Sequence, residues 1–455
     1  MKRATDPRHN RREFLKHAAA AAGTFAVPLV VPSRALGQDG AVAPSNRIAL
    51  GFIGVGMMGR GHVRICSQHP DAQVLAVCDV DRWRREDAKT TVEQAYAART
   101  TGGTYRGCDA YNDLRELLRR GDIDAVVVAT GDNWHGPATV MAAKAGKDVY
   151  CEKPISKTIR EARAMVETAR RYGRVVQSGL QQRSTPEFIK ASRLVLNGAI
   201  GKVKIVYIAF PGTNSDVDLP GQPVPDGLDW NLWLGPAPWR RFNGRFHIYG
   251  RPPHVVPWHF CRDFGGGNLT SNAVHSFDVV QWALGMDESG PVEIVPPGTG
   301  EYPALTYKYA DGTLLQVVNW KLDPREHFVP EGWDVNTRLQ NFGALYVGEK
   351  GWIHVGRQGY LTGYPREILE EPAGQPDGSH PVGGHHQNWL DCIKTRREPA
   401  CDVAIGCRST IVAHLGCIAH WTGRALKWDP AKEEFLGDDE ANRLRFRAMR
   451  EPWRI

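Results

Sequence analysis

A short apolar run that closes on three spaced glycines constrains this chain more than any other feature. Residues 47–55 are largely apolar and lead into Gly54-x-Gly56-x-x-Gly59, and residues 57–67 have helical composition. A buried strand followed by a helix is the context in which such a turn binds a dinucleotide, because glycines allow close backbone approach and the helix N-terminus receives the pyrophosphate. The turn predicts a cofactor cradle made by Gly54, Gly56, Met57, Met58 and Gly59.

A carboxylate follows at the spacing that a dinucleotide site requires. Asp79 lies 20 residues past Gly59, at the end of a predicted strand over residues 73–80. At this place a carboxylate accepts a hydrogen bond from the ribose 2′-OH and repels a 2′-phosphate. Asp79 therefore predicts NAD in preference to NADP. Three arginines just downstream keep NADP open as the alternative, namely Arg82, Arg84 and Arg85.

Apolar strands alternate with helical segments through the first part of the chain. The predicted strands are residues 47–55, 73–80, 123–130, 148–151 and 174–179, and the predicted helices are 57–67, 81–98, 111–120, 137–145 and 156–171. This alternation is typical of a doubly wound α/β sheet with parallel strands. We therefore predict a Rossmann nucleotide-binding domain over residues 47–180.

The pattern changes after residue 201. Longer and partly alternating runs at 202–210, 313–320 and 344–355 predict strands of a large, mostly antiparallel open sheet. We expect this sheet to belong to an α+β substrate and oligomerisation domain over residues 181–385. Helical segments at 387–397 and 407–422 follow, and we expect residues 386–455 to pack back on the core.

The N-terminus has the features of an export signal. Residues 11–16 read Arg-Arg-Glu-Phe-Leu-Lys and precede an apolar stretch over 18–31, which is too short to span a bilayer. The paired arginines resemble a twin-arginine signal, so we predict a signal segment over 1–37, a linker over 38–46 and a periplasmic protein without stable membrane insertion. An ordinary secretory signal or an uncleaved anchor is the alternative.

The basic charge of the chain is concentrated in this segment. Residues 1–37 hold seven basic and two acidic side chains, which account for most of the formal charge of +7. The rest of the chain is close to neutral, so the composition argues against a nucleic-acid partner. The nine cysteines are scattered and contain no Cys-x-x-Cys pair. We expect neither a disulfide framework nor a metal site, and we expect most cysteines to be small buried hydrophobes.

The tripeptide Glu152-Lys153-Pro154 carries the strongest chemical prediction. It follows the predicted strand 148–151, where the second half of the nucleotide fold ends. Burial and a nearby cationic nicotinamide both lower the pKa of a lysine toward neutrality, which suits a proton carrier. Lys153 therefore predicts hydride transfer at a carbinol, with Lys153 exchanging the hydroxyl proton.

Two further segments supply candidate side chains. Residues 130–135 follow the third apolar strand at the ligand-binding edge, so Thr130, Asn133 and His135 are candidate cofactor or substrate contacts, and capping of a helix by Asp132 or Asn133 is the alternative. The triple glycine 265–267 opens a predicted amphipathic helix over 268–284, which holds His275 as a candidate general acid or base. Trp230, Trp233, Trp239 and Trp258 lie in the loop 211–264, where we favour loop packing over stacking on sugar rings.

These segments together resemble the glucose–fructose oxidoreductase, inositol dehydrogenase and rhizopine-catabolism (Gfo/Idh/MocA) superfamily, in its exported branch. The resemblance also runs through Gln181-Gln182-Arg183-Ser184, residues 229–238 and Trp428-Asp429-Pro430. It implies a Rossmann domain, a second domain with an open sheet, and a dimer or tetramer built on that sheet. Many members use a Lys–Asp–His set. Lys153 and His275 match it, whereas Ser271 stands at the aspartate position. Either Asp278 or Asp263 orients His275 instead, or the chemistry differs from that of the dehydrogenases in the family.

The resemblance completes the predicted site. Glu152 and Gln181 join the cofactor contacts, and the substrate contacts are predicted to be Arg183, Trp258, Arg262, Asp263 and Asp278. The favoured function is an NAD(P)-dependent oxidoreductase that acts on a sugar or polyol with tightly held cofactor. One alternative is an NAD-dependent glycoside hydrolase that works by oxidation, elimination and hydration without net redox change. A carbohydrate-binding protein without catalysis is the third possibility.

Overall fold

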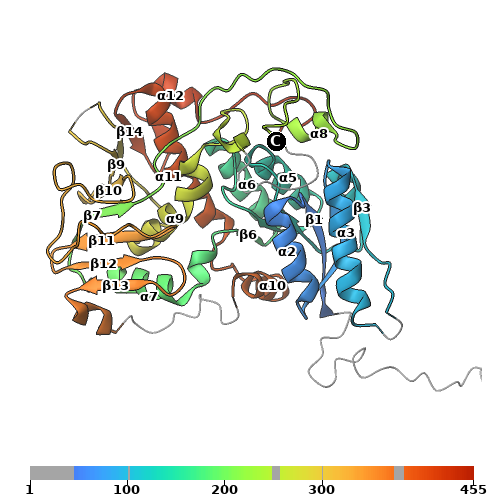
Figure 1. Ribbon diagram of the computed structural model, residues 1–455, viewed down its shortest axis with the longest axis horizontal. Coiled ribbons are helices and arrows are strands. Elements are labelled where there is room, and N and C mark those ends of the chain that lie inside the picture. The colour runs from blue at the N-terminus through green and yellow to red at the C-terminus, as the bar shows by residue number, and fades with distance from the viewer. Residues whose placement is uncertain (1–45, 101–102, 248–256, 300, 373–383) are drawn as a thin grey trace, which may run out of the picture. The chain divides into compact units, whose positions relative to one another are not determined.

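A sheet of parallel strands organises the N-terminal part of the protein. In the computed structural model, which describes residues 46–100, 103–247, 257–299, 301–372 and 384–455, six of the described strands pair in the order β3-β2-β1-β4-β5-β6 (Figure 1). They are β1 (Ile48–Ile53), β2 (Ala72–Cys78), β3 (Asp109–Tyr111), β4 (Ala125–Val128), β5 (Asp148–Cys151) and β6 (Val176–Ser178). The predicted signal 1–37 and all but the last residue of the linker 38–46 lie outside the described residues.

The strand order reverses between β1 and β4. β1 pairs with β2 on one side and with β4 on the other, and both pairings are parallel. Helices cover both faces of the sheet, which explains why strands such as β4 (Ala-Val-Val-Val) are apolar on every residue. Loops that leave the carboxyl ends of β1 and β4 diverge at this point, and the crevice between them is where doubly wound sheets bind ligands. The predicted α/β class is confirmed.

Three of the five helices described in this region begin at side-chain caps that the sequence supplies, and the other two begin at glycines. The five are α2 (Met57–Gln68), α3 (Arg82–Ala97), α4 (Leu114–Leu118), α5 (Asp132–Lys144) and α6 (Ile159–Tyr172). Asp81 caps α3 by accepting from the backbone of Trp83 and Arg84. Thr158 caps α6 by accepting from the Glu161 N–H, and the Thr158 hydroxyl also bonds the Glu161 carboxylate.

Helix α5 starts five residues before the predicted start at Pro137. Pro137 lies inside the helix and has no N–H to donate to the carbonyl of Asn133. That carbonyl accepts instead from the guanidinium of Arg447, at 2.7 Å. The C-terminal segment thus satisfies the backbone group that the proline leaves open, so the helix continues through it.

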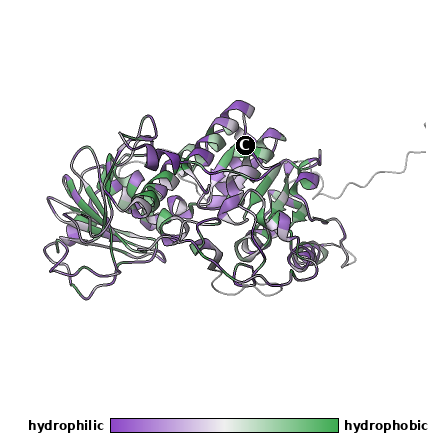
Figure 2. Cartoon of the chain, turned by 90° about the horizontal axis from the view of Figure 1, so that it is seen from above, coloured by the Kyte–Doolittle hydropathy of each residue, from purple (hydrophilic) through white to green (hydrophobic). Residues whose placement is uncertain are grey.

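A second sheet is mostly antiparallel, as predicted. Within the described residues its nine strands run β13-β12-β11-β7-β10-β9-β8-β14-β15, and β7 with β10 forms the single parallel pair. The strands are β7 (Val203–Ile208), β8 (Glu293–Val295), β9 (Leu305–Lys308), β10 (Leu314–Val317), β11 (Ala344–Gly348), β12 (Trp352–Val355), β13 (Leu361–Tyr364), β14 (Leu426–Asp429) and β15 (Glu434–Phe435). Figure 2 shows both sheets coloured as largely hydrophobic.

One strand prediction was wrong in this sheet. The run 344–355 is a hairpin of β11 and β12 and not a single strand, because the polar residues Glu349 and Lys350 form its turn. Side chains of β7 alternate between two cores: Val206 and Ile208 face the helices, whereas Ile205 and Tyr207 pack under the segment 318–339. Both faces of the sheet are therefore covered around β7.

The remaining described helices cap and connect these layers. They are α7 (Pro186–Leu196), α8 (Trp230–Leu234), α9 (Val274–Ala283), α10 (His385–Thr395), α11 (Val403–Thr422) and α12 (Asp439–Arg443), with the shorter turns η3 (Gln181–Ser184), η4 (Pro257–Phe260), η5 (Leu269–Ala273) and η6 (Arg366–Glu370). Trp389 and Leu390 of α10 pack into the same core as Leu50 of β1. Helix α7 and strands β8, β9, β13, β14 and β15 had no sequence prediction.

Helices α9 and α11 lie between the two sheets (Figure 1). Among the described residues α11 alone is long and apolar enough to cross a membrane, but 78% of its apolar window is buried within the protein. Such burial is that of a core helix. The expectation of an amphipathic helix over 268–284 is corrected, because every residue of α9 is buried. All nine cysteines are buried and free, as predicted.

A buried ion-pair network ties α9 to the turn η3. Arg183 bonds both carboxylate oxygens of Asp278 at 2.9 and 3.0 Å and also pairs with Asp287 at 2.6 Å. Arg183 and Asp278 are almost completely buried. Their predicted role as substrate contacts is corrected, because neither lines the cavity and Arg183 donates to Asp278 and Asp287 instead.

Replacement of Arg183 by methionine should destabilise the protein strongly. The variant leaves the Asp278 carboxylate buried without its cation, a change that typically costs about 3–5 kcal/mol. Burial already raises the pKa of Asp278 to about 6 against the lowering effect of Arg183, so the loss should shrink at pH 5, where the carboxyl takes up a proton. Urea unfolding at pH 5 and pH 8 measures this.

The matched control is Arg325→Met. Arg325 pairs with Asp323 on the surface, with 87% of its side chain exposed. Its replacement should leave the free energy of unfolding almost unchanged, because solvent screens an exposed ion pair. Equal effects of the two substitutions would contradict a structural role for Arg183.

Candidate active site

The glycine turn forms one end of a cavity of about 630 Å³ at the carboxyl edge of the parallel sheet. Gly54 has a φ of +83°, and a Cβ on Gly59 would lie 2.1 Å from the Gly54 carbonyl oxygen. Gly56 precedes α2 and offers no side-chain cap, so the first N–H groups of the helix remain for a ligand. These residues fit a dinucleotide pyrophosphate. Gly54, Gly56, Met57 and Met58 line the cavity, whereas Gly59 brings α2 close to β1.

Asp79 holds the position that a ribose contact needs. One carboxylate oxygen accepts from the Val55 N–H at 2.9 Å and the other from the Asp81 N–H at 2.9 Å. These two bonds fix the carboxylate beside the glycine turn, where it lines the cavity. Each oxygen keeps a lone pair that can accept from a ribose hydroxyl. Arg84 also lines the cavity and pairs with Asp81 at 3.4 Å.

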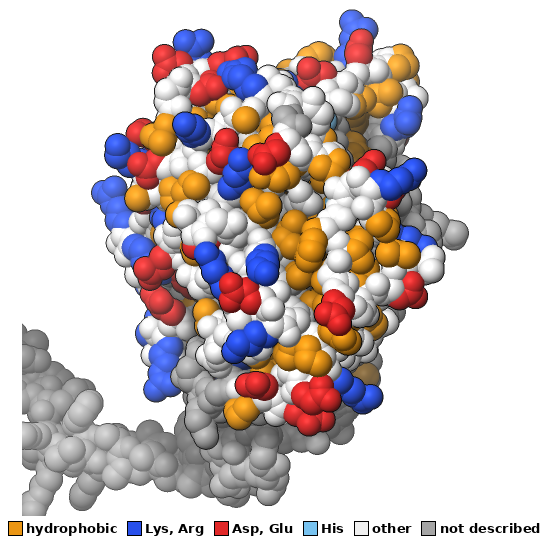
Figure 3. Space-filling model, turned by 90° about the vertical axis from the view of Figure 1, so that its left-hand side faces the viewer, with side chains coloured by type: hydrophobic (Ala, Val, Ile, Leu, Met, Phe, Trp, Pro, Cys, Tyr) orange, Lys and Arg blue, Asp and Glu red, His pale blue; other side chains and the backbone are white. Residues whose placement is uncertain are grey.

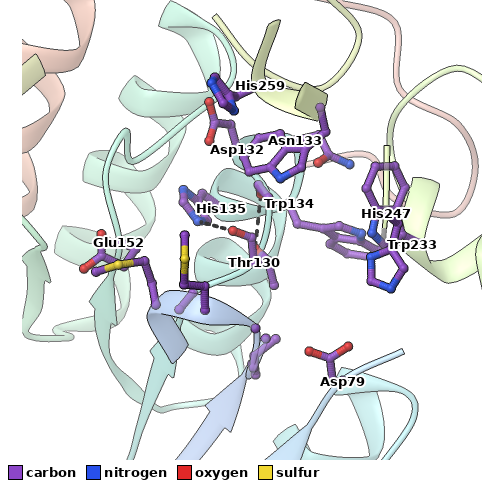
Figure 4. Close-up of a pocket in the computed structure, with 18 of the residues that line it drawn as sticks. Asp79, Thr130, Asp132, Asn133, Trp134, His135, Glu152, Trp233, His247 and His259 are labelled. Carbon is purple, nitrogen blue, oxygen red and sulfur yellow. Dashed lines mark hydrogen bonds between the residues drawn. The ribbon is translucent and has the colours of Figure 1, made fainter. Parts of the chain in front are cut away.

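The loop after β4 forms the next part of the wall. Thr130, Asn133 and His135 all line the cavity, as Figure 4 shows. The His135 ring lies between two carbonyl oxygens, Pro154 O at 2.6 Å and Thr130 O at 3.1 Å. Burial lowers the pKa of His135, so the neutral ring donates its single proton to Pro154. His135 therefore ties the Thr130 loop to the Glu-Lys-Pro segment.

Helix capping does not explain Asp132 or Asn133. Helix α5 has Gly131 as its N-cap, and no side chain caps it. The Asn133 amide instead donates to Leu234 O at 3.0 Å. Asp132 is 3% exposed, and its Oδ2 atom has no hydrogen-bond partner. Burial raises the pKa of Asp132 to about 7 in spite of the nearby Lys153 and Lys157 ammonium groups.

Lys153 reaches the cavity from the end of β5. Its Nζ donates to Ser271 O at 2.6 Å, and Ser271 belongs to η5, a π-helical turn that leads into α9. Such turns are frequent at functional sites because they widen the helix locally. Burial lowers the pKa of Lys153, although the neighbouring Glu152 and Asp132 carboxylates oppose this. The lowered pKa favours exchange of a proton at Nζ, while the hydrogen bond to Ser271 O holds the amine in place.

Glu152 lines the cavity beside Lys153 and is held on both oxygens. Oε1 bonds His62 Nε2 at 2.9 Å and Gln181 Nε2 at 3.1 Å, and Oε2 accepts from the Lys153 N–H at 3.1 Å. Burial alone would raise the pKa of Glu152, but the His62 hydrogen bond and charge, with Lys153, lower it well below its usual value. Gln181 does not line the cavity; it positions Glu152.

The structure does not bring His275 to the cavity. The Gln182 amide lies between His275 and Arg357. In the orientation that satisfies both of its ends, its nitrogen donates to His275 Nδ1 at 2.8 Å and its oxygen accepts from Arg357 at 2.9 Å. Burial, followed by the charges of Lys153 and Arg357, lowers the pKa of His275 well below its usual value. Gln182 thus orients the ring, and the expectation of Asp278 or Asp263 in that role is corrected. The proposed proton carrier is Lys153 alone.

Among the predicted substrate contacts, Trp258 lines the cavity. Arg262 stacks on Trp421 with its guanidinium carbon 4.3 Å from the ring centre, and Asp263 pairs with Arg240 at 3.0 Å. Neither residue lines the cavity, so both predictions are corrected: Asp263 is paired with Arg240, and Arg262 lies on the Trp421 ring. The triple glycine does permit close approach: a Cβ on Gly267 would lie 2.4 Å from the Thr213 backbone.

Sequence reasoning missed several lining residues. Trp233, His247, His259 and Phe260 come from the loop 211–264, and Asn268 and Asn272 from the start of η5. Figure 4 shows the Asp132 carboxylate beside the His259 ring, at the end of the cavity away from Asp79. His247 accompanies Trp233 and bonds the Asp81 carboxylate at 3.0 Å. Only the composition of that loop, rich in tryptophan and histidine, could have pointed to them.

The fold and cavity define a class of protein: a Rossmann-type dinucleotide enzyme with a second sheet beside the site. Residues 48–180 match the family model described as "Oxidoreductase family, NAD-binding Rossmann fold". Residues 205–333 and 348–455 match "Oxidoreductase family, C-terminal alpha/beta domain". The chain belongs to this Gfo/Idh/MocA oxidoreductase family, which confirms the resemblance to the superfamily and NAD as the cofactor.

Individual relatives cover much of the chain. Inositol 2-dehydrogenase 2 of Saccharopolyspora erythraea is 32% identical over 315 residues, which are 69% of this chain and 74% of that protein. A glycosyl hydrolase family 109 protein of Shewanella pealeana is 36% identical over 176 residues, 36% of this chain and 37% of that protein. The crystal structure of aldose-aldose oxidoreductase from Caulobacter crescentus shares the fold, with a TM-score of 0.54, 20% identity and coverage of 84% and 99%.

In the part of the chain that the structure describes, no group of three or more histidine, cysteine, aspartate or glutamate side chains is placed to hold an ion.

Replacement of Asp132 by asparagine should stabilise the cofactor-free protein. The carboxyl has a raised pKa in the folded state, so the folded state binds more protons than the unfolded state between about pH 4 and pH 7, and stability falls as the pH rises through this window. Asparagine removes that penalty. We expect a gain of roughly 2–4 kcal/mol at pH 8 and little change at pH 4, measured by urea unfolding.

Asp226→Asn serves as the control, since Asp226 is exposed. It should alter stability by less than about 0.5 kcal/mol at either pH. A loss of stability in Asp132→Asn at pH 8 would show that the carboxylate has a stabilising partner, against the geometry described above.

Proposed function

We propose that this protein is an NAD(H)-dependent oxidoreductase that transfers a hydride at a carbinol of a sugar, polyol or sugar derivative. The observation that carries the proposal is Lys153. Its amine lies in the wall of the same cavity that the glycine turn and Asp79 line, and burial lowers its pKa there. A general base must lie within reach of both the hydroxyl and the hydride acceptor.

Each group along the cavity wall has a separate role in the proposed reaction. The glycine turn and Asp79 hold the NAD pyrophosphate and ribose, and bound NAD supplies the hydride acceptor. Lys153 takes the hydroxyl proton at Nζ during oxidation and returns it during reduction. Ser271 O holds the amine in place through its 2.6 Å hydrogen bond. Lys153 thus performs the proton transfer without the aspartate that many relatives have at position 271.

The far end of the cavity suits a polyhydroxy substrate. Trp258 offers an apolar ring face, whereas Asp132 and Asn272 offer polar groups. The unpartnered Asp132 oxygen can accept from a sugar hydroxyl, an interaction worth about 1.5–3 kcal/mol for a charged acceptor. The similarity to inositol 2-dehydrogenase supports a polyol or sugar as substrate.

NAD is favoured over NADP because Asp79 occupies the ribose position. The carboxylate would lie against the 2′-phosphate of NADP and repel it. Arg84 in the cavity wall is the one feature that favours NADP, but its guanidinium is paired with Asp81. Arg85 adds no support for the NADP alternative predicted from Arg82 and Arg85, because it donates to the Asp79 carbonyl oxygen and to the Asn112 side chain.

The redox-neutral glycoside hydrolase remains the second candidate. It is supported by the similarity to the glycosyl hydrolase family 109 protein, which covers about a third of this chain. This hydrolase would need the same NAD site at the glycine turn and Asp79, and the same base, Lys153. The two functions differ in net cofactor turnover, because the hydrolase returns its hydride to the same sugar.

We expect NAD(H) to stay bound through purification of the exported protein without added nucleotide. Addition of myo-inositol or an aldose such as D-glucose should raise the absorbance at 340 nm, and a second carbonyl compound should lower it again. Lys153→Met should lower kcat by about 10²–10⁴-fold while binding NAD as before, since general-base catalysis contributes that much. Lys144→Met, at an exposed position, is the control.

Other outcomes assign the alternatives. Cleavage of aryl glycosides with no lasting absorbance change would establish the glycoside hydrolase. Unchanged kcat in Lys153→Met would remove Lys153 from the mechanism. Silence of wild type and Lys153→Met alike toward every sugar and glycoside would favour the binding protein without catalysis.

We also propose export to the periplasm through the twin-arginine route. Arg11 and Arg12 with the apolar residues 18–31 support it. Arg11→Lys with Arg12→Lys should leave the protein in the cytoplasm, as fractionation of producing cells would show. Equal export of the double variant would favour an ordinary secretory signal. A protein exported in the folded state can carry its nucleotide with it.

We propose further that the protein is a homo-oligomer, as its resemblance implies. Apolar side chains lie exposed in the loops and strand ends of the nine-stranded sheet, including Phe328 at 59%, Val335 at 38% and Tyr364 at 37%. Figure 3 looks onto the side of the molecule where this sheet lies and shows hydrophobic side chains in a broken band between charged ones. Such a face suits association between subunits.

A further inference from the structure

A chain of hydrogen-bonded side chains leads from the cavity wall to the surface. Glu152 lines the cavity, and its Oε1 bonds His62 Nε2 at 2.9 Å. The other ring nitrogen, His62 Nδ1, bonds His386 Nε2 at 2.8 Å. His62 is buried, whereas His386 is partly exposed. Three groups that can each accept and release a proton therefore follow one another without a gap.

The surrounding side chains hold these rings in line. The Tyr150 ring stacks on His386 with centres 5.2 Å apart and planes at 13°, and lies 5.1 Å from the His62 ring. Gln181 donates from the same nitrogen to the Tyr150 hydroxyl at 2.9 Å and to Glu152 at 3.1 Å. Segments far apart in sequence, β5, α2, η3 and α10, thus meet at this chain.

The protonation states suit transfer of a proton. Burial lowers the pKa of His386 to about 3, with the charges of His62 and His385 acting in the same direction. A neutral imidazole has one donor and one acceptor nitrogen, so it can take a proton on one side and release one on the other. The titratable and charged groups that face the chain from neighbouring elements are Lys153, His275, Arg357, His385 and His69.

We propose that Glu152, His62 and His386 form a proton path between the reaction cavity and solvent. The inference rests on the proposed oxidoreductase function, because oxidation of a carbinol releases one proton for each hydride transferred. Lys153 receives that proton and must lose it before the next turnover. A bound cofactor and sugar fill the open side of the cavity, whereas the path leaves through its wall.

The transfer balances atom by atom. When both rings carry their proton on Nδ1, the state that an inward transfer leaves, Glu152 takes a proton from the cavity and passes one at once to His62 Nε2, while His62 Nδ1 gives its proton to His386 Nε2. His386 releases its Nδ1 proton to water, and Glu152 is again a carboxylate. The net change is one proton moved from the cavity to solvent, with both rings left in the opposite tautomer. The reverse sequence supplies a proton during reduction.

A purely structural role for these groups is the competing explanation. Histidine and glutamate inside a core need hydrogen bonds whether or not a proton moves. The two roles differ under His386→Gln, which preserves a donor for His62 Nδ1 but cannot pass a proton through a ring. His69→Gln, at the C-terminal end of α2 and outside the chain of bonds, is the matched control.

The test follows hydride and proton separately. Stopped-flow mixing of the holoenzyme with myo-inositol or D-glucose, in weak buffer with a pH-indicator dye, records the absorbance at 340 nm and the release of protons. In wild type the two should coincide. In His386→Gln the first hydride transfer should keep its rate, proton release should lag behind it, and kcat should fall about tenfold with little change in KM.

Rescue by small proton carriers completes the kinetic test. Imidazole should restore kcat of His386→Ala toward the wild-type value, and high buffer concentration should do so for His386→Gln. His69→Gln should respond to neither. A variant at position 386 with unchanged kcat and simultaneous proton release would overturn the proposal, and so would a loss of kcat that imidazole does not reverse.

A measurement without substrate separates failure of this path from failure of the proposed function. In ¹⁵N-histidine-labelled protein, the His62–His386 bond should give ring nitrogens coupled across a shared proton, and His386→Gln should abolish that signal. Wild type that reduces no NAD with either sugar but shows the coupled rings would reject the substrate assignment. Absence of the N–H···N bond in wild type would reject the path itself.

Discussion

The parallel register of four strands is the constraint on which the rest of the site depends. β1, β2, β4 and β5 pair in parallel, so their carboxyl ends meet at a single edge. Each strand delivers one functional group there: the glycine turn, Asp79, the Thr130 loop and Glu152-Lys153. No long-range fold other than this one places those four segments side by side, since they are separated by helices in sequence. The His135 ring then lies between two of them, with its nitrogens 2.6 Å from Pro154 O and 3.1 Å from Thr130 O.

The sequence predicted this edge well because its signals are local. A glycine turn, a carboxylate at a fixed spacing and an apolar strand each act within a few residues, so Gly54, Asp79 and Lys153 were placed correctly in the cavity wall. The errors arose where charged residues meet partners far along the chain. Arg183 finds Asp278 and Asp287, and Asp263 finds Arg240. A charge near a motif looks like a substrate contact until its tertiary partner is known.

The helix at 268–284 illustrates the same limit. Its polar residues suggested an amphipathic face, but α9 lies between two sheets and is buried on every side. His275 therefore accepts a hydrogen bond from the Gln182 amide inside the core instead of facing the cavity. The π-helical turn before it, which presents Ser271 O to Lys153, has no sequence pattern of its own. By contrast, the sequence offered helix capping as one possible role of Asp132. Only the fold shows that this carboxyl is buried and that its Oδ2 atom has no hydrogen-bond partner.

An uncompensated buried carboxylate and a lysine with a lowered pKa both weaken folding, so their retention in one cavity points to function. The proposed proton path also bears on which function that is. A redox-neutral hydrolase keeps its sugar bound between oxidation and reduction and releases no net proton between the two steps. A coupled oxidoreductase releases its first product in between, and the proton on Lys153 has to leave the cavity while the reduced cofactor stays. A wall that offers Glu152, His62 and His386 in sequence serves that second situation. The route to solvent therefore favours net oxidation of a free sugar or polyol over transient oxidation of a glycoside.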